Sequence, residues 1–388
     1  MERETMKALI NGVILMHDTE VTDKALLFDK HIVGLVARDE IPSEYEIIDV
    51  EGAYISPGLI DLHIHGYAGE DTSDGSEKGV RKIAKHLLEN GVTSFLPTTM
   101  TIDWAELEAA FDVVRKLKAD SEHADFDGAA ILGVHAEGPF INPKRKGAQA
   151  EEAIITPDAD KILKHKDIVR ILTMAPEMKG GIEMIKRVTE ESDIVVSIGH
   201  TDATFEIALE AIEAGASYVT HLFNAMTGLN HRNPGVVGAA LQAPVMTEVI
   251  ADTFHVHPGL FRFLHDTKKN RLVLITDCTR AGGLGDGEYT LGGQPIYVKG
   301  IECRLEDGTI AGSVLKLNEA VRNLRDRAGL STAVAVKAAS LVPATAIGVA
   351  DRIGSLDAGK DADIVLFDQD MTTKAVYIKG QLKYQQGA

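Results

Sequence analysis

The sequence predicts an α/β protein: a (β/α)8 barrel with a small β-sandwich domain built from both ends of the chain. Three observations favour this fold class. Eight apolar, β-branched segments alternate with amphipathic helical segments through the middle of the chain. Several helical segments end at glycine, as at Asn90-Gly91 and Ala214-Gly215. The two flanks contain only short strand-like runs, and neither could bury a sheet face alone.

The eight apolar segments are the predicted barrel strands, within a barrel that spans residues 57–352. The strands are expected at Leu59–Ile64, Thr93–Pro97, Ala130–Val134, Val169–Met174, Ile194–Ile198, Tyr218–His221, Val245–Ile250 and Arg271–Ile275. Helical patterns lie between them, at Lys78–Asn90, Trp104–Lys118, Gly181–Glu191, Phe205–Ala214 and Pro258–Lys268. A doubly wound nucleotide-binding sheet would need a glycine-rich turn after the first strand, and that strand ends instead in His63-Ile64-His65.

The flanks predict one small β-domain shared by both termini. Residues 1–56 contain strand-like runs at Lys7–Leu15, Lys24–Phe28 and His31–Ala37. Residues 353–388 contain similar runs at Asp363–Leu366 and Lys374–Lys379. Because neither set is large enough to be stable alone, we expect the two to pair.

Composition narrows the class of protein. Hydrophobic residues make up 45% and charged residues 25% of the 388 residues, as in an ordinary globular protein. The net charge of −18 opposes non-specific binding to nucleic acid or to an anionic membrane, so an anionic substrate would need local cations. Two cysteines cannot form a disulfide framework. The first residues, Met1 to Ile10, show no signal-peptide core, and we expect a cytoplasmic enzyme.

Metal-binding residue types gather at the predicted carboxyl ends of the strands, where barrel active sites lie. His63 and His65 end the first strand, and their spacing places both side chains on the same face. Two imidazoles so placed can bind one borderline metal ion. An isolated His-x-His pair is often chance, but the apolar neighbours here favour burial, and a buried histidine needs a partner. Asp61 and His135 occupy similar strand-end positions.

Glu137, His200 and His221 are the other predicted ligands. Glu137 ends the third strand, where a buried carboxylate needs a cation, and His200 and His221 end the fifth and sixth strands. Each histidine taken alone is more often a hydrogen-bonded core residue. Together they favour three protein ligands with an open position, which is a catalytic arrangement. Zinc, iron, manganese and cobalt all suit these ligands.

Asp277 is the predicted proton carrier, because it ends the apolar eighth strand. A carboxylate facing a metal can take a proton from the attacking water and pass it to a leaving group. A role as a further metal ligand stays open and is compatible with the first. Cys278 is the alternative nucleophile, but a buried free cysteine usually packs as a small hydrophobe.

Three other features are expected to lie outside the site. Lys144-Arg145-Lys146 is interpreted as a solvated charge run. Gly282–Gly285 is interpreted as a mobile loop. A surface position is expected for His86, His123 and His165.

Longer motifs carry a family resemblance. Ser56-Pro-Gly-Leu-Ile-Asp-Leu-His-Ile-His65 resembles the opening metal strand of the amidohydrolase superfamily, and Gly354–Val365 resembles its return into the small β-domain. Within that superfamily, further motifs are similar to those of N-acetylglucosamine-6-phosphate deacetylases over essentially the whole chain. They are His135-Ala-Glu-Gly-Pro-Phe140, Gly199-His-Thr-Asp-Ala203, His221-Leu-Phe-Asn-Ala-Met226, His231-Arg-Asn-Pro-Gly235 and Ala311-Gly-Ser313.

The resemblance implies metal ligands at Glu137, His200 and His221 and a catalytic acid/base at Asp277. His63 and His65 are both present, so one or two divalent ions per subunit are expected. The implied reaction is hydrolysis of the acetamide of N-acetylglucosamine 6-phosphate to acetate and glucosamine 6-phosphate, in amino-sugar catabolism. Hydroxide generated at the metal would attack, with Asp277 acting first as base and then as acid. A homodimer is also implied, with some phosphate contacts crossing between subunits.

Substrate contacts carry over from the same resemblance. They fall on Ala148, Gln149, Asn224, Ala225, Arg232, His255, Ala311, Gly312 and Ser313. Gln149 stands where some members have histidine. Arg232 is predicted close to the metal, since its planar fork of donors suits a phosphate, and His255 could hold a sugar hydroxyl or the phosphate.

Two other functions compete with this one. A deaminase or cyclic amidase of the same superfamily is disfavoured by the motif His135–Phe140. A non-catalytic barrel that has lost its metal is disfavoured by the intact set of ligands. Metal analysis of the purified protein separates the catalytic from the non-catalytic hypothesis.

Overall fold

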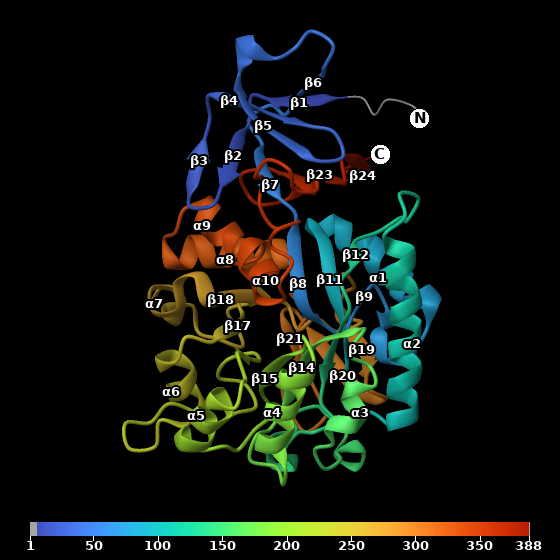
Figure 1. The fold of residues 1–388 in the computed structure, drawn as a ribbon, viewed down its shortest axis with the longest axis vertical. Coiled ribbons are helices and arrows are strands. Elements are labelled where there is room, and N and C mark those ends of the chain that lie inside the picture. Colours follow the sequence, from blue (N-terminus) through green and yellow to red (C-terminus); the bar gives the residue numbers. More distant parts are fainter. Residues whose placement is uncertain (1–5, 388) are drawn as a thin grey trace.

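The computed structural model describes residues 6–387. Residues 1–5 and residue 388 lie outside the described residues. Part of the segment Met1 to Ile10, for which no signal-peptide core is expected, is therefore not described. The chain forms the predicted (β/α)8 barrel with a small β-domain at one end (Figure 1). The barrel strands are β8 (Leu59–Ile64), β11 (Val92–Thr99), β13 (Val134–Glu137), β14 (Val169–Met174), β15 (Val195–Ile198), β16 (Tyr218–Val219), β17 (Met246–Ile250) and β18 (Leu272–Ile275).

The barrel strands are parallel, and each pairs with the next in chain order from β8 to β18. The ring is completed just beyond the strand ends, where the Asp277 N–H donates to the His63 carbonyl over 2.8 Å and Ile64 pairs with Cys278. The eight-stranded barrel is therefore confirmed. Its closure brings the ends of the first and last strands together, although more than 200 residues separate them in the sequence.

The predicted third strand is wrong in its bounds. The chain forms a two-residue strand, β12 (Ala130–Ile131), and then the barrel strand β13 (Val134–Glu137). Gly133 separates them with a φ of +144°, a backbone conformation that side chains rarely adopt. The interruption moves the barrel strand toward the carboxyl end, so His135 and Glu137 belong to the strand itself.

Residues 6–387 contain ten α-helices, most of which cover the outside of the barrel (Figure 1). In α1, Ser76 caps the amino end by accepting from the Gly79 N–H, and Val80, Ile83 and Leu87 form a buried stripe. The helices are α1 (Glu77–Leu87), α2 (Trp104–Ser121), α3 (Ala159–Leu163), α4 (Gly181–Glu191), α5 (Phe205–Glu213), α6 (Gly235–Gln242), α7 (Phe261–Lys268), α8 (Leu317–Ala328), α9 (Thr332–Lys337) and α10 (Leu341–Ala346). None of them is long and apolar enough to cross a bilayer.

Both termini contribute to the small β-domain, as predicted. One sheet, ordered β5-β4-β1-β6, comes from the N-terminal flank alone. The other, ordered β24-β23-β22-β7-β2-β3, joins the two flanks where β22 pairs antiparallel with β7. The strands are β1 (Lys7–Ile10), β2 (Val13–Met16), β3 (Thr19–Val21), β4 (Lys24–Phe28), β5 (Ile32–Ala37), β6 (Glu46–Asp49), β7 (Tyr54–Pro57), β22 (Ile364–Phe367), β23 (Thr373–Ile378) and β24 (Gln381–Gln385).

The small β-domain has a hydrophobic core of its own. Leu9, Phe28 and Ile55 from the N-terminal flank pack with Ile364 and Leu366 from the C-terminal flank in one buried cluster. This is why neither flank is sufficient alone: each supplies part of a shared core. The exact domain boundaries at 56/57 and 352/353 stay predictions.

An unpredicted three-stranded antiparallel sheet follows the eighth barrel strand. Its strands are β19 (Gly287–Leu291), β20 (Gln294–Lys299) and β21 (Glu302–Arg304). It begins directly after Gly282–Gly285, the expected mobile loop. Two further two-residue strands, β9 (Gly66–Tyr67) and β10 (Glu70–Asp71), form a small hairpin after β8.

The surface position expected for His165 is wrong. This side chain is buried beside Phe111, and its Nε2 lies 3.0 Å from Glu108 Oε1. His123 is exposed and His86 is partly exposed. The difference arises because His165 follows the short helix α3, which tucks its end against α2.

Candidate metal centre and active site

Three of the predicted site residues stand at sharp turns just beyond barrel strands. The φ angles are +47° for His200, +26° for His221 and +51° for Asp277. Non-glycine residues in such conformations cost of order 1–3 kcal/mol and cluster at functional sites. The turns take these side chains out of the strand alternation, and all three line one cavity at the carboxyl end of the barrel.

Glu137 lies at the centre of the cluster. Its Oε1 is 3.1 Å from His200 Nε2 and 3.0 Å from His221 Nε2, and the two ring nitrogens are 3.1 Å apart. All three side chains are almost fully buried. The structure thus brings together the three residues that the sequence analysis assigns to one metal ion, as a group with converging ligand atoms.

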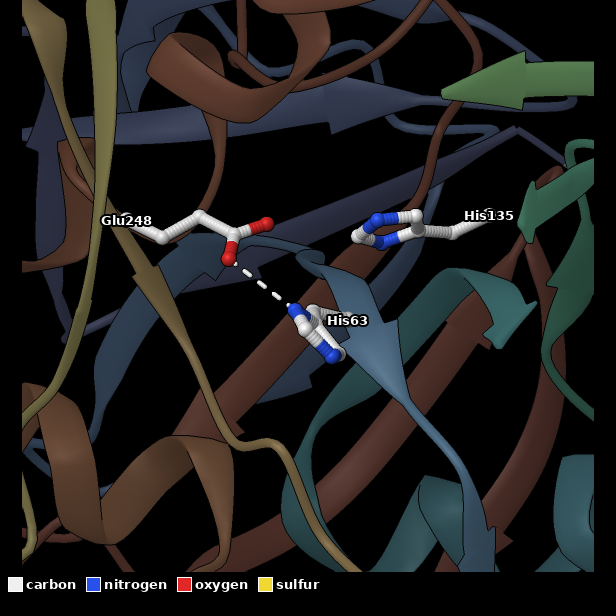
Figure 2. Close-up of side chains that lie close together, drawn as sticks. All are labelled: His63, His135 and Glu248. Atoms are coloured by element: carbon white, nitrogen blue, oxygen red, sulfur yellow. Dashed lines mark hydrogen bonds and ion pairs between the residues drawn. The ribbon is translucent and has the colours of Figure 1, made fainter. Parts of the chain in front are cut away.

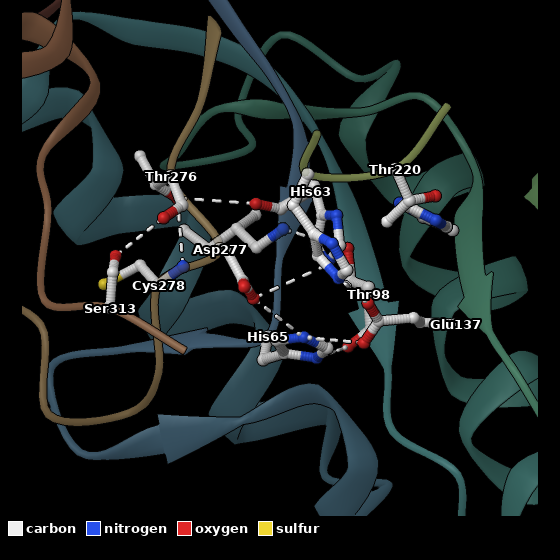
Figure 3. A network of polar contacts seen from close by, with 12 residues as sticks. His63, His65, Thr98, Glu137, Thr220, Thr276, Asp277, Cys278 and Ser313 are labelled. Carbon is white, nitrogen blue, oxygen red and sulfur yellow. Dashed lines mark hydrogen bonds and ion pairs between the residues drawn. The ribbon is translucent and has the colours of Figure 1, made fainter. Parts of the chain in front are cut away.

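A second group adjoins the first through the same carboxylate (Figure 3). His65 Nε2 lies 3.2 Å from Glu137 Oε2 and 3.2 Å from Asp277 Oδ1. His63 Nε2 lies 3.3 Å from Glu137 Oε1 and 3.5 Å from Asp277 Oδ1. Glu137 therefore stands between two candidate metal positions, with Asp277 beside the second.

Hydrogen bonds on the far side of the His200 and His65 rings favour cation binding at the near side. The carbonyl oxygen of Arg145 lies 2.9 Å from His200 Nδ1, and the carbonyl oxygen of Thr98 lies 3.3 Å from His65 Nδ1. A carbonyl only accepts, so each Nδ1 carries the hydrogen and each Nε2 of a neutral ring turns a lone pair toward Glu137. Lone pairs facing a carboxylate repel unless a cation lies between them. The donor set of imidazole and carboxylate suits a divalent transition metal.

Without a metal ion, a proton takes the place of the cation between ring and carboxylate, and the pKa values reflect this. Burial disfavours charge on His65, but hydrogen bonds to Asp277 and Glu137 outweigh it and raise the pKa to about 9. Burial likewise opposes ionisation of Asp277, but the neighbouring charge of His63 and the hydrogen bond to His65 lower its pKa to about 2. Asp277 is therefore an ionised carboxylate at neutral pH. Burial raises the pKa of Cys278 well above its usual range, which agrees with a packed thiol and not a nucleophile.

Beneath the cluster lies a buried polar group that sequence analysis recognised only in part (Figure 2). Glu248, on β17, was missed: its Oε2 lies 3.0 Å from His63 Nδ1. His135 is a core histidine, between the Leu62 carbonyl at 2.9 Å and Thr173 Oγ1 at 2.7 Å. The signal for Glu248 was a single acidic residue within an apolar strand.

The cavity has a volume of about 380 Å³ and contains most of the predicted substrate contacts. His255 lines it, with its Nδ1 2.6 Å from Asp252 Oδ2. The unpredicted sheet supplies Leu291 to the wall. The predicted contacts that line the cavity are Ala148, Gln149, Asn224, Ala225, His255 and Gly312.

Two residues that are predicted to contact the substrate make hydrogen bonds within the protein instead. Gln149 is 2% exposed; its Nε2 donates to Glu137 Oε2 over 2.6 Å, and its Oε1 accepts from the Thr101 N–H over 2.6 Å. Ser313 donates its hydroxyl to the Thr276 carbonyl over 2.6 Å, and its N–H donates to the Asp277 carbonyl over 2.7 Å. Both residues hold site residues in place, and Ala311 and Ser313 do not line the cavity.

The two cationic segments differ in their relation to the cavity. Arg232 is exposed and is not among the residues that line the cavity of its own chain, so its place near the metal stays a prediction. Lys144 and Arg145 do line the cavity, although the run was interpreted as solvated. Arg145 is held there because its Nε donates to Asp202 Oδ1 over 2.9 Å, and its carbonyl faces His200.

Comparisons with known proteins agree with this geometry. Residues 54–383 match the Amidohydrolase family. The chain is 40% identical to the N-acetylglucosamine-6-phosphate deacetylase of Bacillus subtilis (strain 168), with 89% of each chain covered. It is 36% identical to the N-acetylgalactosamine-6-phosphate deacetylase of Escherichia coli O157:H7, over 90% of this chain and 92% of that one.

Solved structures give the same result. The N-acetylglucosamine-6-phosphate deacetylase of Pasteurella multocida superposes with a TM-score of 0.92 at 30% identity, covering 97% of this chain and 99% of that one. A mutant of the Mycobacterium smegmatis enzyme, in complex with N-acetyl-D-glucosamine-6-phosphate, superposes with a TM-score of 0.89 at 29% identity, covering 98% of this chain and 100% of that one.

Proposed function

The chain belongs to the amidohydrolase family, and from this premise we propose that it hydrolyses the acetamide of N-acetylglucosamine 6-phosphate to acetate and glucosamine 6-phosphate. The observation that carries the proposal is the convergence of His200 and His221 on Glu137, with the Asp277 carboxylate beside them, at the floor of one cavity. The names of the relatives support the amide and the phosphorylated sugar as substrate.

Glu137, His200 and His221 would hold one divalent ion, and His63 with His65 would hold a second. When bound, such an ion polarises the acetyl carbonyl and lowers the pKa of water. Because these ring and carboxylate side chains are buried, bulk water screens their charges little, which strengthens their electrostatic effect on the substrate. Zinc, iron, manganese and cobalt are all compatible with these ligands.

Asp277 would act as the general base and then as the general acid. Its carboxylate is ionised at neutral pH in the metal-free site, because the charge of His63 and the bond to His65 outweigh burial and hold the pKa at about 2. A cation bound to these histidines would favour the ionised form in the same way. Asp277 takes a proton from the attacking water as the bond to the acetyl carbon forms. It then gives a proton to the sugar nitrogen as the carbon–nitrogen bond breaks.

Cations at the cavity rim would hold the phosphate. Arg145 and Lys144 line the cavity of the same chain, whereas Arg232 is exposed outside it. We propose a homodimer in which Arg232 reaches the phosphate bound by the partner subunit. Local cations are required because the net charge of −18 repels an anionic substrate. A cytoplasmic location stays part of the proposal.

The test compares substrates side by side. Turnover is measured with N-acetylglucosamine 6-phosphate, with unphosphorylated N-acetylglucosamine and with N-acetylgalactosamine 6-phosphate, the substrate named for one relative. The proposal expects the first to have the highest kcat/KM. Release of acetate from none of the three by metal-loaded protein would refute it, and preference for the galactose epimer would change the sugar while leaving the reaction class intact.

A further inference from the structure

Glu248 belongs to neither of the two proposed sets of metal ligands. Its side chain is fully buried at the middle of β17. One oxygen, Oε2, accepts from His63 Nδ1 over 3.0 Å (Figure 2). The same oxygen accepts from the backbone N–H of His221 over 2.9 Å. A single atom therefore contacts one residue from each of the two proposed ligand sets.

The contact with His63 decides which way that ring presents its lone pair. The Glu248 carboxylate only accepts here, so the hydrogen lies on His63 Nδ1. The lone pair of a neutral ring is then on Nε2, which faces Glu137 Oε1 at 3.3 Å and Asp277 Oδ1 at 3.5 Å. A carboxylate behind a ligating histidine fixes the orientation of the ring and raises its basicity.

The contact with His221 acts on the backbone. His221 lies two residues beyond β16 with a φ of +26°. Its backbone N–H therefore does not take part in the hydrogen bonds between barrel strands. A buried N–H without an acceptor destabilises the fold. Glu248 supplies that acceptor, so it stabilises the turn that directs the His221 ring to Glu137.

A separate metal site beneath the first one is the alternative, because ligand atoms of His63, His135 and Glu248 lie close together. The hydrogen bonds oppose it. His135 uses both ring nitrogens, on the Leu62 carbonyl and on Thr173 Oγ1, and His63 Nδ1 carries the hydrogen shared with Glu248. The imidazole nitrogen of this group that keeps a lone pair is His63 Nε2, and it faces Glu137 and Asp277 in the site above.

We propose that Glu248 is a positioning residue that ties the two ligand sets together, by fixing the ring of His63 and the backbone turn of His221. The proposal rests on the proposed metal-dependent function. It concerns the affinity of the site for its metal and the stability that the fold gains when the metal binds. It does not concern the choice of substrate.

The experiment measures zinc affinity of the metal-free protein by competition with a chromophoric chelator. Glu248→Ala should weaken zinc binding by about 10–100-fold, the range for residues behind metal ligands. Glu248→Gln should lose less, because its amide oxygen can accept both hydrogen bonds. Ser197→Ala is the matched control: Ser197 is buried in the barrel interior and bonds only Thr220, so it should bind zinc like the parent.

A readout of stability separates positioning from a merely structural role. Urea midpoints are compared with and without zinc, and the gain on zinc binding should shrink in Glu248→Ala. An equal gain in parent and variant, or affinity within twofold of the parent, would overturn the proposal. If the alanine variant does not fold, Glu248→Met, which fills a similar volume without an acceptor, replaces it. A parent that binds zinc but releases no acetate would refute the proposed function and leave this inference standing.

Discussion

Replacing Gln149 by leucine tests whether this residue holds Glu137 or contacts the substrate. Leucine keeps much of the volume but removes both polar atoms. The change would leave the Thr101 N–H without its acceptor and Glu137 Oε2 without its amide donor. Because Thr101 and Glu137 are buried, water cannot easily replace either bond.

The magnitude follows from these two bonds. A hydrogen bond to a charged group contributes about 1.5–3 kcal/mol, and a buried unsatisfied N–H costs about 1–3 kcal/mol. One side chain makes both bonds, so the losses overlap, and we expect the free energy of unfolding to fall by about 3 kcal/mol. Zinc affinity should fall by about tenfold or more, because Glu137 loses its orientation.

Urea denaturation and chelator competition measure the two effects, and steady-state kinetics measure KM. Gln294→Leu is the matched control, since Gln294 donates to the neighbouring Ala148 carbonyl over 2.7 Å without touching Glu137. Parent-like stability and zinc affinity in Gln149→Leu, together with a raised KM, would refute this reasoning. Gln149 would then be the substrate contact that the family resemblance implies.

Three further predictions concern catalysis, phosphate binding and pH. Asp277→Asn should keep fold and metal and lose about 10²–10⁴-fold in kcat; near-normal turnover with metal bound would contradict its role. Arg232→Ala should lose about 10–100-fold in kcat/KM on the phosphorylated sugar and little on the unphosphorylated one; equal losses would indicate support of the loop. Burial raises the pKa of Asp363 to about 6 from 3.8, so the folded state holds this proton more tightly and stability falls as pH rises through that window. Asp363→Asn, which keeps an acceptor for the Lys379 N–H, should therefore be more stable than the parent at pH 7 by up to about 3 kcal/mol and similar below pH 4; equal urea midpoints at pH 7 would exclude this.

Local patterns were sufficient for the fold class. The apolar segments Leu59–Ile64 and Val169–Met174 are strands with the predicted bounds, because burial on both faces of a parallel strand requires a continuous apolar run. The shared small domain was also predictable, since short strands at both ends lack partners of their own. The third strand was misplaced because its interruption depends on the φ of one residue, Gly133.

Residue type and strand-end position brought out the candidate ligands, because a buried histidine or carboxylate needs a partner that few side chains can supply. Only the tertiary structure shows which residues hold these ligands in place through hydrogen bonds. Glu248 and Gln149 act through contacts across 185 and 12 residues of sequence, and no periodicity encodes such pairs. Arg145 and Arg232 look alike in the sequence, as cations in polar loops. Only the packing of those loops places the first at the cavity and the second outside it, because a loop's path depends on the elements it joins and not on its own composition.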